Sequence, residues 1–271
     1  MTLVSTKWLS KNINKVKIID ASWHLVKNRN AIEEYNKEHI EGAIFFDLNK
    51  NSNQRKDLPH GHFLPSVADH EKKISEMGIL NTDRIIIYCY SDLISSCRAW
   101  FQFLYFGHDP KLVSVLNGGM KKWKLEGRKV TSLKSEVIPS IYKGIENKNM
   151  IKIKSQIDEN IKKNQFTVLD ARSKNRFLGL EPEPRPGVKS GSIEASKSLP
   201  LSEIVNLEDN TFLDKKKLEG IFNKGQINSN KIVMSCGSSV SAASLALAYS
   251  LINDDYTPKI YIGSWTEFGK K

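Results

Sequence analysis

The sequence predicts an α/β fold in which two similar domains follow one another, each a mostly parallel sheet flanked by helices. Short apolar runs, such as residues 85–89 and 231–236, alternate with segments of helical periodicity. This alternation is typical of parallel sheets that are covered on both faces. Four segments also recur in the same order 145 to 153 residues later, which indicates a tandem duplication.

Four pairs of matching segments carry the duplication: 16–21 with 166–171, 39–43 with 192–196, 85–89 with 231–236, and 117–123 with 262–268. Each copy is expected to run helix, strand, loop, short strand, helix, strand, loop, helix, strand, turn and helix. The stretch 131–149 is polar and Lys-rich and contains Pro139, a composition that favours a linker. We therefore expect a first domain at residues 1–135, a linker at 136–149 and a second domain at 150–271.

The composition is that of a globular protein with ample core, since 39% of the 271 residues are hydrophobic and 26% are charged. No window approaches eighteen uninterrupted apolar residues, so we expect no membrane span. The first residues lack the apolar core of a secretory signal, and we expect a cytoplasmic protein. The three cysteines, Cys89, Cys97 and Cys236, form neither a disulfide framework nor a CxxC zinc pair. Reduced thiols are therefore expected.

The net charge of +11 would suit a nucleic acid or a membrane surface. However, most of the positive residues are lysines spread over the whole length, and no nucleic-acid-binding motif accompanies them. We therefore expect no nucleic-acid partner and no membrane partner. Attraction of small anionic substrates is the more natural use of this charge.

Cys236 is the strongest candidate for a functional residue. It ends the apolar strand 231–236 and precedes three small residues and an apolar helix expected at 240–252. The unpaired amides of a helix N-terminus favour negative charge, so a sulfur held there is expected to ionise readily and act as a nucleophile. The alternative is a small buried hydrophobic residue, which is the usual place of a free cysteine.

Several longer segments resemble the tandem rhodanese family of sulfurtransferases over essentially the whole chain. They are HIEGAIFFDLN (39–49), SVLNGGMKKW (114–123), DARSKNRFLGLEPEPRPG (170–187), CGSSVSA (236–242) and YIGSWTEFG (261–269). The resemblance implies two rhodanese-like domains, with Cys236 as the nucleophile of the second domain. It also implies a catalytically degenerate first domain, with Cys89 at the equivalent position, and no metal or organic cofactor.

The residues after Cys236 bear on the sulfur donor. In the thiosulfate-specific branch of this family the next two positions are basic, whereas here they are Gly237 and Ser238. The chain is therefore most similar to the 3-mercaptopyruvate branch, with thiosulfate as the alternative donor. By the same resemblance, Arg176 and Arg185 hold the carboxylate and keto group of the donor; the alternative is two surface arginines in a Pro-rich loop. A guanidinium matches a carboxylate in bidentate geometry.

The resemblance further implies that the loop containing Gly237, Ser239, Val240 and Ser241 surrounds a persulfide on Cys236. Ser238 is the hydroxyl expected to move a proton, supported by His62 and an acid. The family's acid position is occupied by Asn49, and we consider Asp47 or Asp57 as substitutes. Ser239 stands where the family has glycine, so the loop could be slightly redirected. The sulfur acceptor would be cyanide or a thiol, such as that of a thioredoxin-like protein.

Two other functions compete with this interpretation. A cysteine-dependent phosphatase needs an arginine six residues after its nucleophile, but that position is Ala242. A non-catalytic rhodanese-like binding protein would be expected to have lost the nucleophile. The retention of Cys236, Arg176 and Arg185 argues against it.

Overall fold

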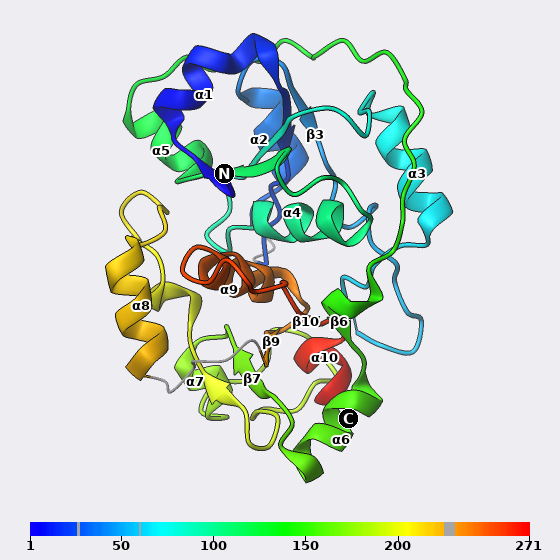
Figure 1. The fold of residues 1–271 in the computed structure, drawn as a ribbon, viewed down its shortest axis with the longest axis vertical. Helices are drawn as coiled ribbons and strands as arrows, with labels where there is room; N and C mark the ends of the chain where they lie inside the picture. The colour runs from blue at the N-terminus through cyan, green and yellow to red at the C-terminus, as the bar shows by residue number, and fades with distance from the viewer. Residues whose placement is uncertain (26–27, 60, 225–230) are drawn as a thin grey trace. The chain divides into compact units, whose positions relative to one another are not determined.

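The computed structural model describes residues 1–25, 28–59, 61–224 and 231–271. The chain divides into two compact units (Figure 1). The first consists of Met1–Asn51, Pro65–Asn147 and Asn206–Phe212, and the second of Ser52–Leu64, Lys148–Val205 and Leu213–Lys271. Each unit therefore includes a short segment from the other half of the sequence.

The first unit is built on one five-stranded parallel sheet with the strand order β1-β5-β4-β2-β3. Its strands are β1 (Leu3–Val4), β2 (Lys17–Asp20), β3 (Ala43–Phe45), β4 (Ile85–Tyr88) and β5 (Val113–Leu116). Its helices are α1 (Thr6–Asn12), η1 (Ile13–Lys15), α2 (Ala31–Lys37), α3 (Val67–Glu76), α4 (Ser96–Tyr105) and α5 (Gly119–Leu125).

The second unit has the same design, with the strand order β6-β10-β9-β7-β8 in a parallel sheet. Its strands are β6 (Ile151–Lys152), β7 (Thr167–Asp170), β8 (Lys197–Ser198), β9 (Ile232–Ser235) and β10 (Ile260–Tyr261). Its helices are η2 (Lys148–Met150), α6 (Lys154–Lys163), α7 (Lys174–Phe177), η3 (Leu201–Glu203), α8 (Lys215–Lys224), α9 (Val240–Ser250) and α10 (Ser264–Phe268).

The two strand orders are identical once each number in the first sheet is raised by five, which confirms the predicted fold class of two α/β repeats. The structure adds one two-residue edge strand per unit, β1 and β6, that the sequence did not reveal. Residues 132–147, in the polar stretch that follows the first repeat, form neither helix nor strand. No helix in the described ranges is long and apolar enough to cross a membrane.

The central strands of the second sheet position the candidate nucleophile. Strand β9 lies between β7 and β10, and all four of its residues are buried. Cys236 directly follows β9, at the carboxyl edge where sites form in parallel α/β sheets. Helix α9 starts four residues later and is buried from Val240 to Tyr249, because its small and apolar side chains let it pack closely on all sides. The turn at Cys236 is thus held between two buried elements.

Candidate active site around Cys236

Residues 236–239 form the turn between β9 and α9, and Ser264 ties its two ends together. The Ser264 hydroxyl accepts hydrogen bonds from the amide of Cys236 (3.3 Å) and the amide of Ser239 (3.1 Å). The same hydroxyl donates to the carbonyl of Tyr261 (3.0 Å). The amides of Trp265 and Thr266 donate to the carbonyls of Cys236 and Gly237, both at 2.9 Å. The start of α10 therefore fixes the backbone beside the sulfur.

Ser239 adopts the left-handed backbone conformation that glycine usually supplies, with φ 64° and ψ 5°. Beyond the bond to Ser264, the Ser239 hydroxyl donates to the carbonyl of His62 (3.2 Å). These contacts give the serine two anchors in a conformation that is otherwise unfavourable for a residue with a Cβ atom. The glycine-to-serine departure noted in the sequence is thus accommodated at this position.

The structure brings Ser238, His62 and Arg185 together. The Ser238 hydroxyl accepts a hydrogen bond from Arg185 Nη2 (2.8 Å) and lies 3.1 Å from His62 Nδ1. All three residues are buried, with exposed fractions of 3%, 2% and 8%. His62 belongs to segment 52–64, which clusters with the second unit although it comes from the first half of the sequence. A hydroxyl between an imidazole and a guanidinium can relay a proton.

Arg176, in α7, faces the same turn. A Cβ atom added to Gly237 would lie 3.2 Å from both Arg176 Nη2 and Arg185 Nη1. The absence of a side chain at Gly237 therefore lets two guanidinium groups approach the backbone next to Cys236. Val240 and Ser241 form the first residues of α9, and both are buried.

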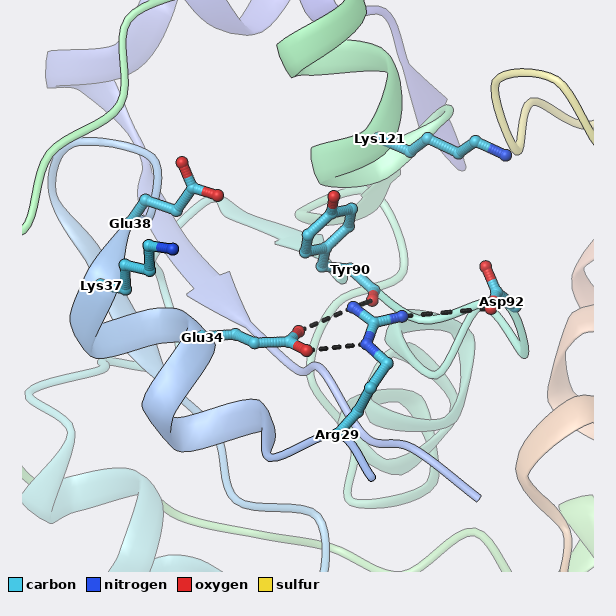
Figure 2. A pocket seen from close by; sticks show the side chains of 7 residues that line it. All are labelled: Arg29, Glu34, Lys37, Glu38, Tyr90, Asp92 and Lys121. Carbon is cyan, nitrogen blue, oxygen red and sulfur yellow. Dashed lines mark hydrogen bonds and ion pairs between the residues drawn. The ribbon is translucent and has the colours of Figure 1, made fainter. Parts of the chain in front are cut away.

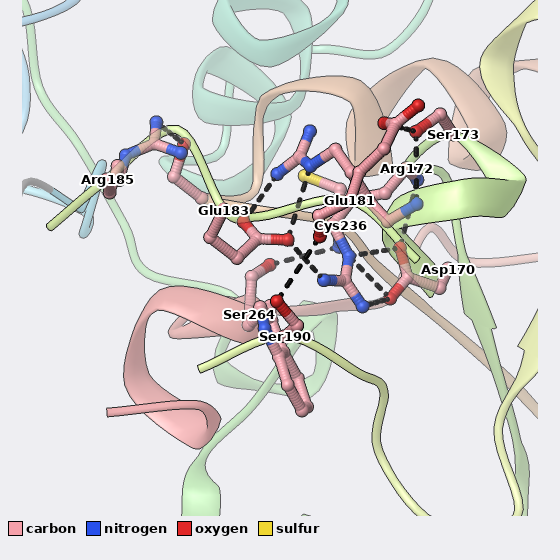
Figure 3. Close-up of polar contacts among 12 residues, drawn as sticks. Asp170, Arg172, Ser173, Glu181, Glu183, Arg185, Ser190, Cys236 and Ser264 are labelled. Carbon is pink, nitrogen blue, oxygen red and sulfur yellow. Dashed lines mark hydrogen bonds and ion pairs between the residues drawn. The ribbon is translucent and has the colours of Figure 1, made fainter. Parts of the chain in front are cut away.

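Three polar residues of this site were not singled out from the sequence: Glu183, Arg172 and Ser264 (Figure 3). Glu183 binds Arg176 through both carboxylate oxygens, at 3.2 and 2.7 Å, and Arg172 Nη1 at 2.7 Å. Arg172 in turn donates to both oxygens of Asp170 and lies over the ring of Trp265 at 4.7 Å. In the sequence, the only hint that Glu183 belongs to the site is its place two residues before Arg185, in the stretch EPEPR (181–185).

Burial and neighbouring negative charges shift the pKa of Arg185 in opposite directions. Burial lowers the pKa of its guanidinium, because the charged form loses hydration. Negative charges on Cys236 and Glu183 oppose this lowering of the pKa, whereas the nearby Arg176 adds to it. An anion bound beside Cys236 would therefore stabilise the charged form of Arg185.

The two substitutes considered for the missing acid are engaged elsewhere. Asp47 accepts hydrogen bonds from the amides of Asn49 (3.0 Å) and Lys50 (3.1 Å), as a residue that caps a turn does. Asp57 is half exposed and pairs with Arg55 at 2.7 Å and with Lys270 at 3.9 Å. Asn49 accepts a hydrogen bond from Trp23 Nε1 at 3.1 Å. No cluster of His, Cys, Asp and Glu in the described part of the chain could hold a metal ion.

The first unit has a different arrangement after its own central strand. Cys89 follows β4 and is buried, and burial raises the pKa of its thiol. Its turn leads to α4 through six residues, 90–95, instead of three. Gly119 occupies the position of Ser264, and a Cβ atom there would lie 2.4 Å from the carbonyl oxygen of Cys89. The first unit thus has no room for the serine that braces the second turn. Cys97 is fully buried in α4.

A cavity of about 420 Å³ opens beside the Cys89 turn, lined by Arg29, Glu34, Lys37, Glu38, Tyr90, Asp92 and Lys121 (Figure 2). Its lining carries three cationic and three anionic side chains, and Arg29 pairs with Glu34 and Asp92. Arg29 binds both oxygens of Glu34 at 2.7 Å, and its Nη2 donates to the carbonyl of Tyr90 at 2.9 Å. This pairing leaves little unbalanced charge for an anionic donor.

Comparisons with known proteins identify the family of this chain. Residues 5–126 match the model of the family described as Rhodanese-like domain. The thiosulfate sulfurtransferase of Rattus norvegicus is 34% identical, over 99% of this chain and 92% of the relative. The 3-mercaptopyruvate sulfurtransferase of Homo sapiens is 32% identical, over 98% of this chain and 91% of the relative.

Solved structures give the same result for the fold. SseA from Escherichia coli, described among 3-mercaptopyruvate sulfotransferases, superposes with a TM-score of 0.82 at 27% identity, covering 98% of this chain and all of that one. Tum1 from Saccharomyces cerevisiae superposes with a TM-score of 0.87 at 24% identity, covering 99% and 94%. The sulfurtransferases of Rattus norvegicus and Homo sapiens match 98–99% of this chain, so the family resemblance seen in the sequence is confirmed over nearly its whole length.

Proposed function

Since this chain belongs to the rhodanese family of sulfurtransferases, we propose that it takes sulfur from 3-mercaptopyruvate and carries it on Cys236 as a persulfide. The family membership establishes a sulfurtransferase. Relatives of nearly equal identity are named for thiosulfate and for 3-mercaptopyruvate, so the choice of donor rests on the site itself.

The observation that carries the proposal is the distribution of charge at the turn. Residues 237–239 are Gly-Ser-Ser and carry no charge, while Arg176 and Arg185 reach the backbone of Gly237 from outside the turn. Thiosulfate is a compact dianion whose charge lies close to its transferable sulfur. In 3-mercaptopyruvate the carboxylate is separated from the sulfur by two carbons, so cations beside the turn suit it better than cations within the turn.

In the first half-reaction the Cys236 thiolate attacks the sulfur of 3-mercaptopyruvate. A sulfur–sulfur bond forms and the carbon–sulfur bond breaks, and its electron pair leaves with the pyruvate enolate. Arg176 and Arg185 hold the carboxylate and the developing enolate oxygen. The Ser238 hydroxyl supplies the proton that converts the enolate to pyruvate, and it receives a replacement proton from solvent through His62, whose Nδ1 lies beside it.

In the second half-reaction an acceptor removes the outer sulfur. Cyanide or a thiolate attacks the outer sulfur of the persulfide, the sulfur–sulfur bond breaks, and its electron pair regenerates the Cys236 thiolate. Amides of the first turn of α9, which lack acceptors within the helix, stabilise the negative charge on sulfur in both steps. A thiol acceptor such as a thioredoxin-like protein requires a reducing compartment, and we propose the cytoplasm.

A donor comparison tests this proposal. The purified protein is assayed with cyanide as acceptor and with either 3-mercaptopyruvate or thiosulfate as donor. We expect the larger kcat/KM with 3-mercaptopyruvate. A larger kcat/KM with thiosulfate would reverse the assignment of the donor, and no transfer from either donor would favour a non-catalytic binding protein.

A further inference from the structure

A chain of alternating charges leads from the sheet to the candidate donor site. Asp170 pairs with Arg172, Arg172 pairs with Glu183, and Glu183 pairs with Arg176, each through a contact of 2.7 Å. The side chains of Asp170, Arg172 and Glu183 are 1%, 1% and 2% exposed. The two carboxylates and two guanidinium groups therefore cancel in net charge, and three of the four are buried, while Arg176 is 16% exposed.

Arg185 forms no ion pair with a member of this chain of charges, although the charge of Glu183 acts on it at longer range. Its Nη2 donates to the neutral hydroxyl of Ser238, and no carboxylate in the described ranges forms an ion pair with it. Arg176 and Arg185 both lie against Gly237, but only Arg176 is matched by a carboxylate. Figure 3 shows Arg185 on one side of Glu183, with Arg172 and Asp170 on the other. The donor consequently meets one uncompensated positive charge.

We infer that Glu183 is a positioning residue that also sets donor specificity, by fixing Arg176 in place and limiting the net charge beside Cys236 to that of Arg185. This inference rests on the proposed function. The single negative charge of a donor with one carboxylate is neutralised by the single unpaired guanidinium of Arg185. A dianion such as thiosulfate would keep one negative charge that no side chain neutralises. Solvent screens buried charges only weakly, so the net charge of these side chains affects the binding energy of the donor.

Glu183→Gln separates this role from ordinary support of the fold. The change keeps the shape and one acceptor oxygen toward Arg176, while it adds one net positive charge to the site. The added positive charge should change kcat/KM for two donors that differ by one unit of charge by factors that differ about tenfold. This is the scale of the interaction between two unit charges several ångströms apart in a partly polar interior. We expect the ratio of kcat/KM for thiosulfate to that for 3-mercaptopyruvate to rise by this factor.

Glu181→Gln is the matched control. Glu181 lies two residues away in the same loop and is exposed, and its carboxylate binds Ser173 Oγ (3.3 Å) and Asn175 Nδ2 (2.9 Å). Its neutralisation should leave the donor ratio within about twofold of the original protein, since solvent screens exposed charges. An equal loss with both donors in Glu183→Gln would overturn the specificity role, because a purely structural residue would act in that way.

A second variant keeps the inference testable if Glu183→Gln does not fold, as judged by circular dichroism. Glu183→Asp retains the charge but withdraws it by one methylene. We expect KM for 3-mercaptopyruvate to rise severalfold with kcat little changed and the donor ratio preserved; a shifted ratio would contradict the charge argument. Failure of the proposed function is recognised separately, in the unaltered protein, by a preference for thiosulfate or by no transfer.

Discussion

At the scale of single residues, our proposal is that the charges of the side chains around Cys236 select the sulfur donor. Arg185 is buried and bound to a hydroxyl, Arg176 is paired with Glu183, and the turn itself is uncharged. A buried guanidinium without a carboxylate partner is costly unless an anion occupies the site, because the charge has lost its hydration. Arg185 is therefore expected to contribute more to donor binding than to the stability of the empty protein.

Replacing Arg185 with leucine tests this assignment. Because a hydrogen bond to a charged group contributes roughly 1.5–3 kcal/mol, we expect KM for 3-mercaptopyruvate to rise by about ten- to a hundredfold. The free energy of unfolding should change little or increase. Steady-state kinetics and urea denaturation give the two quantities, with Arg128→Leu in the first unit as control. An unchanged KM would remove Arg185 from the binding site.

The site residues that the sequence could suggest share one property. Their residue type and their position in a motif are enough to indicate a role. Cys236, Ser238 and the two arginines stand in motifs that the family resemblance carries. Glu183 and Ser264 stand in the same motifs, but their roles depend on which groups they contact after folding. A hydroxyl that accepts from two backbone amides has no signature in sequence. Which acid supports His62 also could not be predicted from the sequence, and the two substitutes that we considered, Asp47 and Asp57, form contacts with other residues.

At the level of elements, the turn between β9 and α9 depends on α10 for its shape. Ser264 is the first residue of α10, and its hydroxyl accepts from amides at both ends of the turn. The first unit has Gly119 at the equivalent place and a turn of different length. The two repeats thus share strands and helices but differ in the connection that carries Cys236, the proposed nucleophile.

Ser264→Ala should weaken this turn. Two buried amides lose their acceptor, and each unsatisfied group costs about 1–3 kcal/mol, so we expect the free energy of unfolding to fall by roughly 2 kcal/mol or more. We also expect kcat to fall more than KM rises, because the sulfur is less well oriented. Ser250→Ala, which removes one hydroxyl contact at the end of α9, is the control. Equal effects of the two variants would contradict the bracing role.

The prediction of elements missed the two-residue strands β1 and β6, and it placed loops where the structure has α2, of seven residues, and α7, of four residues. Strands of four residues, such as β4 and β9, were visible as apolar runs, and the apolar helix was expected at 240–252 and ends at Ser250. The two-residue strands β1 and β6 leave no detectable alternation in the sequence. Their pairing with β5 and β10 is decided by the sheet edge that they join.

For the whole molecule, the internal duplication was the sequence feature that best predicted the fold, because two copies of one pattern in the same order indicate two domains of the same architecture. The copies have diverged in the surroundings of an equivalent buried aspartate. In the second unit Asp170 pairs with Arg172, whereas Asp20 in the first unit has Ser22 at the corresponding place. Burial raises the pKa of Asp20 to about 6 from 3.8, against hydrogen bonds from Ser22 that lower it.

This divergence predicts a pH dependence of stability. Because the pKa of Asp20 is higher in the folded state, its contribution to stability is fully present below pH 3.8 and is lost as the pH rises through 6. Asp20→Asn should therefore gain roughly 2 kcal/mol in unfolding free energy relative to the original protein between pH 4 and pH 8. Urea denaturation of the full chain at both pH values measures this difference.

Asp170→Asn is the matched variant in the second unit. It removes a charge from buried Arg172, so it should be destabilising at pH 8, opposite in sign to Asp20→Asn. If both variants shift the unfolding free energy in the same direction at pH 8, the two aspartates are not in the different environments described.

The most direct test of the sulfur relay is the intact mass of the protein after incubation with 3-mercaptopyruvate in the absence of an acceptor. We predict that the protein gains the mass of one sulfur atom, that cyanide removes it, and that peptide mapping locates it on Cys236. Cys236→Ser should gain nothing. Sulfur retained by that variant, or mapped to Cys89, would contradict the account.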